Sequence, residues 1–212
     1  MNVATRTPLR ARSRRSQAQR TAETRTRIID AAVESISEVG FQNTTAAEIV
    51  RRAGLTWGAV QHQFGGKDGI LKAVLEACFD HFAQCLGDIE PGNRSLKQRI
   101  DLFVDRAWDH FGSPEYRCTF EILLNSVGPE GSDPASLWQS EMFQAWHHIW
   151  ARAFSDARLS RKRMVLLQHY TISVLSGLAC TQILGAPALK PRSGPFLLLK
   201  QTLWSELSVS EN

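Results

Sequence analysis

The sequence predicts an all-α protein, with a small N-terminal helical domain followed by a larger helical domain. Three observations predict this fold class. Apolar residues recur at intervals of three and four along most of the chain, which is the period of a helix. Residues 41–71 contain two short helical patterns separated by a glycine. The 212 residues, 43% of them hydrophobic, support a sizeable core, and a headpiece of about forty-five residues leaves most of it for a second domain.

Residues 41–71 predict two short helices joined by a tight turn and followed by a third helix. Thr45 and Glu48 are spaced as a capping box at the start of the first helix. Gly54 can adopt the left-handed conformation that ends this helix and turns the chain. Thr56 can then cap a second helix that begins at about Trp57. This arrangement is that of a helix-turn-helix, which reads DNA with its second helix.

The helix that begins at Trp57 has a buried side and an exposed side. Val60 and Phe64 are four residues apart and are expected to face inward. The other side chains are mostly small or polar, which permits close approach to a groove and hydrogen bonds to phosphates or bases. Lys67 opens the next helix, whose N-terminal amides suit a phosphate. We expect DNA contacts from Thr45, Thr56, Trp57, Gly58, Ala59, Gln61, His62 and Lys67.

Three blocks in this region resemble the DNA-binding domain of the tetracycline-repressor (TetR) family. They read RIIDAAVESISEVGF, TTAAEIVRRAGLT and GAVQHQFGGKDGIL, and the last is similar to the family's Gly-Thr-Leu-Tyr-x-x-Phe-x-x-Lys-x-x-Leu pattern. The run from Ile28 to Leu71 covers about a fifth of the chain. The resemblance implies a DNA-binding transcriptional regulator, a ligand-responsive repressor that binds a palindromic operator as a dimer. The sequence names neither the effector nor the regulated genes.

Three positions depart from the family pattern. Gln61 stands where the resemblance implies a tyrosine that contacts phosphate, although glutamine also donates hydrogen bonds. Ala47 replaces a longer polar side chain, which removes one potential contact. Trp57 begins the second helix, where relatives more often carry a polar or basic residue. Two interpretations of Trp57 stay open: apolar contact with a thymine methyl group or a sugar, and packing in the core of the small domain.

The chain begins with a strongly basic segment. Its first twenty-seven residues carry eight arginines against the single carboxylate of Glu23, which gives a charge of +7, whereas the rest of the chain carries −3. Because residues 1–20 lack apolar periodicity, they predict a disordered arm that follows phosphates or enters the minor groove. A solvated tail and an organellar transit peptide are the alternatives.

We assign residues 21–66 to the DNA-binding domain and residues 67–212 to an effector-binding and dimerisation domain. Helical spacing and breaks rich in proline and glycine divide the second domain into six helices. They are expected at approximately residues 67–86, 96–111, 114–127, 134–157, 160–184 and 194–207.

The aromatic side chains of the second domain suggest a cavity for an apolar or aromatic effector, since the resembled family has a pocket there. A well-filled helical core explains most of the same residues and is the alternative. A metal site is not expected, because the adjacent His147 and His148 point about a hundred degrees apart on a helix. The expected cavity residues are Trp108, Phe111, Tyr116, Phe120, Glu121, Asn125, Trp138, Phe143, Trp146, His147 and Trp150.

The last two expected helices carry apolar stripes too wide for one helix to bury. Ser173, Gly177, Thr181 and Gly185 recur every four residues and form a ridge of small residues that another helix can approach closely. The family resemblance implies a four-helix dimer interface, which would place two recognition helices on successive major-groove faces. The expected interface residues are Leu167, Val174, Gly177, Leu178, Thr181, Leu199 and Leu203.

The remaining features favour a cytoplasmic protein that needs no cofactor. No apolar run of transmembrane length is expected, and the four cysteines show neither a CxxC pair nor a secretory signal. No catalytic or dinucleotide-binding motif supports an enzyme. Two rival functions remain: a helical ligand-binding protein or enzyme with a vestigial headpiece, and a non-specific architectural DNA binder.

Overall fold

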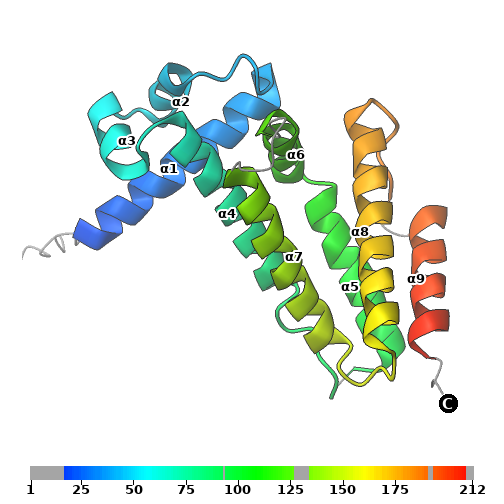
Figure 1. Ribbon diagram of the computed structural model, residues 1–212. Helices are drawn as coiled ribbons and strands as arrows, with labels where there is room; N and C mark the ends of the chain where they lie inside the picture. Colours follow the sequence, from blue (N-terminus) through cyan, green and yellow to red (C-terminus); the bar gives the residue numbers. More distant parts are fainter. Residues whose placement is uncertain (1–16, 93, 127–133, 191–192, 209–212) are drawn as a thin grey trace, which may run out of the picture.

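The computed structural model describes residues 17–92, 94–126, 134–190 and 193–208. Within these ranges the chain forms nine α-helices and no strand, which confirms the all-α prediction (Figure 1). The helices are α1 (Gln17–Val39), α2 (Ala46–Ala53), α3 (Trp57–Phe64), α4 (Lys67–Cys85), α5 (Leu96–Phe111), α6 (Pro114–Ser126), α7 (Pro134–Ala153), α8 (Arg161–Ile183) and α9 (Gly194–Leu207).

Helices α1, α2 and α3 gather at one end of the molecule and share an apolar core with α4 (Figure 1). Ile28 of α1, Ile49 of α2 and Val60 of α3 are fully buried there. Helices α2 and α3 have only eight residues each, so this shared burial, rather than helix propensity, stabilises them. Cys118 and Ile122 of α6 belong to the same core. Helix α6 is therefore packed against the headpiece as well as against the rest of the molecule.

The body of the molecule is built from the long helices α4 to α9, which surround a second core rich in aromatic rings (Figure 1). The rings of Phe103 and Trp150 lie edge to face with centroids 5.3 Å apart. Beside them, the guanidinium of Arg99 is almost completely buried and donates to both carboxylate oxygens of Asp156, at 2.8 and 2.6 Å. This two-point ion pair ties α5 to the turn that follows α7.

Two helix ends differ from the sequence prediction. Helix α1 begins at Gln17, so residues 17–20, which the sequence assigned to the arm, form its first turn. Helix α7 ends at Ala153, four residues earlier than expected. At this second end Arg99 donates to the carbonyl oxygen of Ala153 at 2.5 Å, and so satisfies one of the acceptors that the end of the helix leaves without a helical partner.

The expected capping box at the start of α2 is only half formed. The hydroxyl of Thr45 accepts a hydrogen bond from the backbone N–H of Glu48 at 3.2 Å, as predicted. The carboxylate of Glu48 instead accepts hydrogen bonds from Arg51 and Arg52, each 2.7 Å from the same oxygen. Two guanidinium groups therefore compete successfully with one backbone amide.

Candidate nucleic-acid interface and ligand cavity

The turn between α2 and α3 has the geometry that the sequence predicted. Gly54 adopts φ 61° and ψ 41°, the left-handed conformation that glycine adopts without steric cost, and its N–H donates to the carbonyl of Arg51 at 3.2 Å. Thr56 caps α3 by accepting from the N–H of Ala59 at 3.4 Å. Arg27 reaches across from α1 and donates to the carbonyl of Gly54 at 3.4 Å. The turn is thus fixed on both sides, which sets the direction of α3.

The turn between α3 and α4 is equally constrained. A Cβ atom added at Gly69 would lie 1.7 Å from the carbonyl oxygen of Phe64, so α4 can begin this close to α3 only because residue 69 is glycine. Lys67 lies in the first turn of α4, with its ammonium 4.8 Å from the centre of the Phe41 ring. A cation and the free N-terminal amides of α4 are therefore held beside α3.

The outward side of α3 is nearly free of intramolecular contacts. Trp57 is 48% exposed and makes no ring contact with any residue that the structure describes, so it does not belong to the headpiece core. Gly58, Gln61 and His62 are exposed beside it, whereas Val60 is fully buried. The amide of Gln61 donates to the carbonyl of Gly65 at 3.1 Å. The expected division of α3 into a core side and a free side is thus present.

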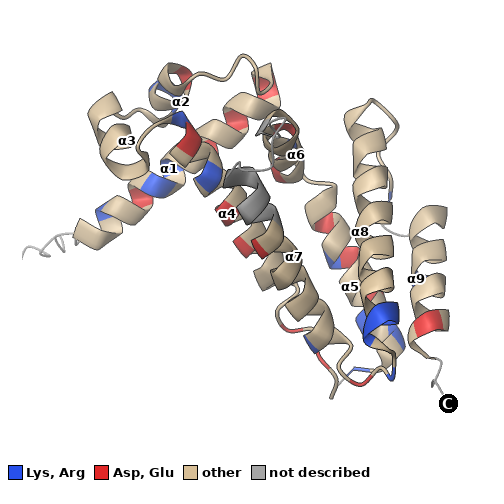
Figure 2. Ribbon diagram, viewed as in Figure 1, with Lys and Arg blue, Asp and Glu red and all other residues tan. Residues whose placement is uncertain are grey.

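Charge is distributed unevenly over the headpiece. Helix α3 contains no lysine, arginine, aspartate or glutamate, whereas basic residues lie on α1 and α2 (Figure 2). Hydrogen bonds from Arg51 and then Arg52 lower the pKa of Glu48 to about 2, so this ion-pair cluster persists at any physiological pH. On α1, the Arg25 guanidinium lies 3.1 Å from the Glu76 carboxylate. Several headpiece cations are therefore already paired within the chain.

Helix α6 contacts the headpiece through two side chains that the sequence analysis placed in the effector cavity. The carboxylate of Glu121 accepts a hydrogen bond from the backbone N–H of Phe41 at 3.0 Å and one from Arg117 at 3.2 Å. The side-chain oxygen of Asn125 accepts from the Gln42 amide at 2.5 Å. Glu121 and Asn125 therefore face the loop between α1 and α2 rather than the cavity, because they lie on the opposite face of α6 from Tyr116 and Phe120.

A cavity of about 390 Å³ lies among α4, α5, α6, α7 and α8. Five of the expected residues are in its wall: Phe111, Tyr116, Phe120, Phe143 and Trp146. Phe79 and Phe82 of α4 also line the cavity, although neither is among the expected cavity residues. The remaining lining residues are Leu75, Cys78, His110, Thr119, Leu123, Leu124, Met142, Ile172, Ser173 and Ser176.

Three other expected cavity residues lie elsewhere. Trp108 packs against Phe196 of α9 at 4.7 Å between ring centroids, and Trp150 is fully buried in the body core. His147 shares a hydrogen bond of 3.2 Å with Gln168 in a separate groove between α7 and α8. Helical periodicity marks all these rings as apolar-face residues, but it does not distinguish one wall of a bundle from another. Trp138, also expected in the cavity, lies outside the residues whose side chains are described.

The polar groups of the cavity wall are uncharged. The hydroxyl of Tyr116 donates to the hydroxyl oxygen of Ser176 at 3.1 Å. Burial, with a smaller contribution from the nearby His81, lowers the pKa of His110 to about 4, so its imidazole is neutral at pH 7. Burial also raises the pKa of the Cys78 thiol. His110 and Ser176 are not among the expected cavity residues, because single polar residues on amphipathic helices form no recognisable sequence pattern.

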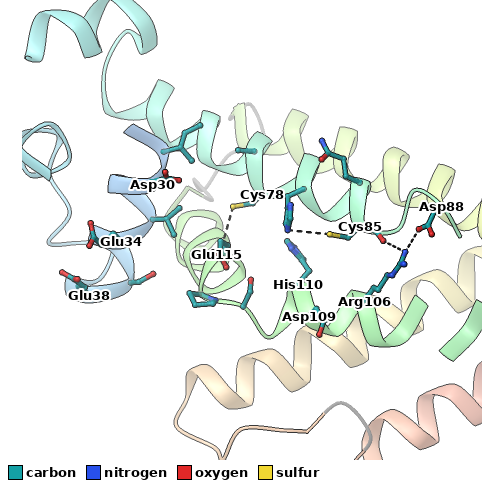
Figure 3. Close-up of a pocket in the computed structure, with 18 residues that line it drawn as sticks. Asp30, Glu34, Glu38, Cys78, Cys85, Asp88, Arg106, Asp109, His110 and Glu115 are labelled. Carbon is teal, nitrogen blue, oxygen red and sulfur yellow. Dashed lines mark hydrogen bonds and ion pairs between the residues drawn. The ribbon is translucent and has the colours of Figure 1, made fainter. Parts of the chain in front are cut away.

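A wider, acidic groove of about 1190 Å³ lies between α1 and the body, on the other side of α4 (Figure 3). The guanidinium of Arg106 donates to the carbonyl of Cys85 at 2.9 Å and to the carboxylate of Asp88. Cys78 and His110 line both this groove and the aromatic cavity, so the two spaces share a thin wall. Six carboxylates line the groove: Asp30, Glu34, Glu38, Asp88, Asp109 and Glu115. Among the described residues no group of three or more potential ligands could hold a metal ion.

Helices α8 and α9 expose an apolar face on the outside of the body. The small-residue ridge from Ser173 to Gly185 is exposed along its whole length, and a Cβ atom added at Gly177 would meet nothing within 4 Å. Leu184 is 81% exposed at its end. The large side chains beside the ridge are also exposed: Leu166, Tyr170, Leu197, Leu198 and Trp204.

Three expected interface residues do not belong to this outer face. Leu167, Leu199 and Leu203 are buried in the core of the protomer, so their side chains are not available to a second copy. The apolar stripes of α8 and α9 extend over both faces of each helix, and the sequence alone did not show which face turns inward. Val174 and Leu178 are partly exposed, whereas Gly177 and Thr181 are exposed.

One further expectation is corrected at α8. By length and composition this helix, Arg161–Ile183, is apolar enough to cross a membrane, with a mean hydropathy of 1.3 over an 18-residue window of which 28% is buried. Its inner face carries the buried polar residues Gln168 and Thr171 and packs in the body core with Leu167 and Leu175. The high mean hydropathy therefore combines a core face with the exposed apolar face described above.

The helix-turn-helix region matches a known protein family. Residues 28–74 match the family model described as bacterial regulatory proteins, tetR family. The HTH-type transcriptional regulator BetI of Burkholderia ambifaria is 28% identical over 169 residues, which are 79% of this chain and 72% of that protein. The regulator SrpR of Pseudomonas putida is 35% identical over 139 residues, 62% of this chain and 58% of that protein.

Solved structures share the whole fold. The SmeT–triclosan complex superposes with a TM-score of 0.64 at 24% identity, over 86% of this chain and 90% of that chain. The multidrug binding protein EbrR, complexed with imidazole, gives a TM-score of 0.61 at 17% identity, over 87% and 95% of the two chains. These similarities extend beyond the helix-turn-helix to the helical body.

Proposed function

Because this chain belongs to the TetR family and is a DNA-binding transcriptional regulator, we propose that it acts as a homodimeric repressor that leaves its operator when a small molecule occupies the body cavity. The relatives are transcriptional regulators rather than enzymes, which supports a function without catalysis. We further propose that the protein works in the cytoplasm. In this proposal the body, residues 67–212, senses the ligand and residues 21–66 read the DNA.

DNA reading is assigned to the free side of α3 and to the groups around it. In the major groove, Trp57 would supply an apolar ring and Gly58 would allow close approach of the backbone. Gln61 and His62 would supply hydrogen-bonding groups. Four further positions are assigned to phosphate contacts at the margin of this free side: the hydroxyls of Thr45 and Thr56, Ala59, and the ammonium of Lys67. The exposure of Trp57 and the neutral surface of α3 support this assignment.

Dimerisation is assigned to the exposed apolar face of α8 and α9. An exposed ridge of small residues flanked by Leu166, Leu184, Leu198 and Trp204 suits a second helix pair that packs closely upon it. A two-fold dimer uses the same patch on both subunits and presents two α3 helices with matching orientation. The operator of such a dimer is a palindrome whose half-sites lie about one helical turn apart, roughly 34 Å.

The response to ligand is assigned to α6. One face of this helix supplies Tyr116, Thr119 and Phe120 to the cavity, and the other holds the loop before α2 through Glu121 and Asn125. A ligand that shifts α6 changes the position of the helix-turn-helix, because the two faces belong to one rigid element. The main support for the proposal is that α6 contacts both the cavity and the loop before α2. The printed descriptions of SmeT with triclosan and EbrR with imidazole give it further support.

Selection of bound sequences from a random duplex pool tests the proposal. We expect a palindromic consensus, which is lost when a ligand of the cavity is added. Enrichment without a consensus would indicate an architectural DNA binder, and no enrichment would indicate a ligand-binding protein or enzyme with a vestigial headpiece. Sedimentation of the protein with a labelled half-site and full site measures whether two protomers bind together.

A further inference from the structure

The cavity in the body has walls that define the chemistry of its ligand. Rings surround it on several sides, from α4, α5, α6 and α7. The volume of about 390 Å³ lies within the range of roughly 300–1,000 Å³ found for small-molecule sites. An engineered cavity of about 150 Å³ holds one benzene ring, so this one has room for two or three rings. The ring-bearing residues are Phe79, Phe82, Phe111, Tyr116, Phe120, Phe143 and Trp146.

No residue in this wall carries a charge at pH 7. None of the lining residues is aspartate, glutamate, lysine or arginine, and the one histidine, His110, is neutral because it is buried. An ionised ligand would therefore lose part of its hydration and find no counter-ion in the wall, which disfavours its binding. The carboxylates of the acidic groove lie beyond Cys78 and His110, on the other side of the shared wall. The cavity thus favours an uncharged ligand.

The polar groups of the wall leave hydrogen-bonding capacity unused. Tyr116 donates its proton to Ser176, so the Ser176 hydroxyl proton is left without an acceptor in the described part of the chain. His110 makes ring contacts with Phe82 at 4.5 Å and Tyr116 at 5.7 Å, but neither ring nitrogen is hydrogen-bonded to a described residue. A ligand oxygen can accept from Ser176, and a ligand hydroxyl can donate to a neutral imidazole nitrogen.

We propose that this cavity binds an uncharged molecule of two or three aromatic rings that carries a hydroxyl group, with the rings among the aromatic wall and the hydroxyl at Tyr116, Ser176 and His110. This inference rests on the proposed effector function and specifies the class of its ligand. These hydroxyl and imidazole groups are partly buried, and a purely hydrocarbon ligand would cover them without offering a hydrogen bond, which makes the ligand hydroxyl the selective element.

Three probes with the same ring system and different charge test the inference. Isothermal titration calorimetry on the full chain at pH 7 compares 2-naphthol, 2-naphthoate and 2-naphthylmethylammonium. We expect 2-naphthol to bind at least tenfold more tightly than either ion. Equal or tighter binding of the carboxylate or the ammonium compound would overturn the inference, as would the absence of binding by all three. A preference for the ammonium compound would instead assign the site to the acidic groove.

Variants locate the bound hydroxyl. Tyr116→Phe and Ser176→Ala are each expected to weaken 2-naphthol binding about five- to tenfold, whereas Ser155→Ala, at an exposed position after α7, leaves it unchanged. Ser176→Asp is expected to reverse the preference toward 2-naphthylmethylammonium, with its folding checked by thermal melting. Unchanged 2-naphthol affinity in both Tyr116→Phe and Ser176→Ala would contradict the placement even if Ser176→Asp fails to fold.

The experiment separates this inference from the proposed function. Calorimetry measures binding to the free protein, whereas release of the selected operator by the same probe measures regulation. Tight binding of 2-naphthol with no release of DNA would support the ligand class and contradict the effector mechanism. Release of DNA only by the charged probes would support the mechanism and contradict the ligand class.

Discussion

The carboxylate of Glu121 accepts a hydrogen bond from the backbone N–H of Phe41 at 3.0 Å, which joins the cavity-lining helix α6 to the loop that leads into α2. Removing this acceptor should uncouple the two ends of the molecule. In Glu121→Ala we expect ligand affinity to stay within twofold, while ligand-induced loss of operator affinity falls by about 1 kcal/mol, a typical part of an allosteric coupling energy. Operator titrations with and without saturating ligand measure this.

Arg117→Ala is the matched control for this variant. Arg117 donates to the other carboxylate oxygen of Glu121 at 3.2 Å from the same helix, so its loss leaves the contact with Phe41 in place. Full coupling in Arg117→Ala together with full coupling in Glu121→Ala would show that this hydrogen bond does not transmit the signal.

Trp57 is expected to affect sequence preference more than stability. Its ring is 48% exposed, so Trp57→Ala should change the melting temperature little while discrimination at one base pair of the operator falls by about 1 kcal/mol. Val60→Ala, in the same helix but fully buried, should cost about 2 kcal/mol of stability. Thermal melting and sequence selection measure the two effects. A large loss of melting temperature in Trp57→Ala with unchanged preference would contradict a DNA contact.

Gly177→Leu should disrupt the dimer without damaging the protomer. A Cβ atom at this position meets nothing within 4 Å in the chain, and replacing a helical glycine favours the helix by up to about 1 kcal/mol. We expect the variant to sediment as a monomer with an intact far-ultraviolet dichroism spectrum and weakened operator binding. Ala151→Leu, at an exposed position on α7, controls for added apolar surface. A dimeric Gly177→Leu protein would place the interface elsewhere.

The ion pair between Arg99 and Asp156 should make stability depend on pH. Hydrogen bonds from Arg99 lower the folded-state pKa of Asp156 below its unfolded value, so the stabilisation is present above the unfolded-state pKa, near 3.9, and is lost as pH falls through the lower folded-state pKa. The Asp156 side chain is 52% exposed, so solvent screens the ion pair, and Asp156→Asn should cost about 1 kcal/mol at pH 7 and progressively less in acid.

Urea denaturation of Asp156→Asn and of the unmodified protein, at pH 7 and at several acidic pH values, measures this difference. Asp109→Asn, on the exposed side of α5, serves as the control. A stability difference for Asp156→Asn that stays constant with pH would indicate that Arg99 is stabilised by its hydrogen bond to Ala153 instead.

Deleting residues 1–20 should flatten the salt dependence of DNA binding. The deletion removes six arginines, and each phosphate contact contributes about 0.9 to the slope of log K against log salt concentration. We expect the slope to fall by about 3 if half of these arginines contact phosphates. Operator titrations between low and physiological salt measure it, and an unchanged slope would remove the arm from the interface.

Local chemistry explains why the helix-turn-helix could be predicted in detail. Three features depend only on residues within a few positions of one another: the cap at Thr56, the left-handed conformation of Gly54 and the inward orientation of Val60. Such features can be predicted from short sequence patterns. The half-formed cap at Glu48 shows the limit of this approach. The Glu48 carboxylate accepts hydrogen bonds from Arg51 and Arg52 instead of from the backbone N–H of Thr45. Residue spacing alone does not predict which of these donors forms the bond.

Helix orientation in the body could not be predicted in the same way. The apolar stripes of α8 and α9 are wide, so their inner residues Leu167 and Leu199 and their outer residues Leu166 and Leu198 look alike in sequence. The hydroxyl pair of Tyr116 and Ser176 is separated by sixty positions. Only the tertiary arrangement of the body brings these two hydroxyls within hydrogen-bonding distance, and no local pattern contains that information.

The ion pairs of Glu48 with Arg51 and Arg52 affect how DNA binding by this regulator can evolve. Glu48 forms ion pairs with both arginines of α2, and α3 carries no charged side chain, so these two helices offer hydrogen-bonding groups for base edges but few unpaired charges for phosphates. Overall attraction to DNA then depends on cations outside these two helices. In the proposed mode of binding, we expect mutations in the arginine-rich beginning of the chain to change the affinity for DNA, and mutations on α3 to change the preferred sequence, so that the two properties can evolve separately.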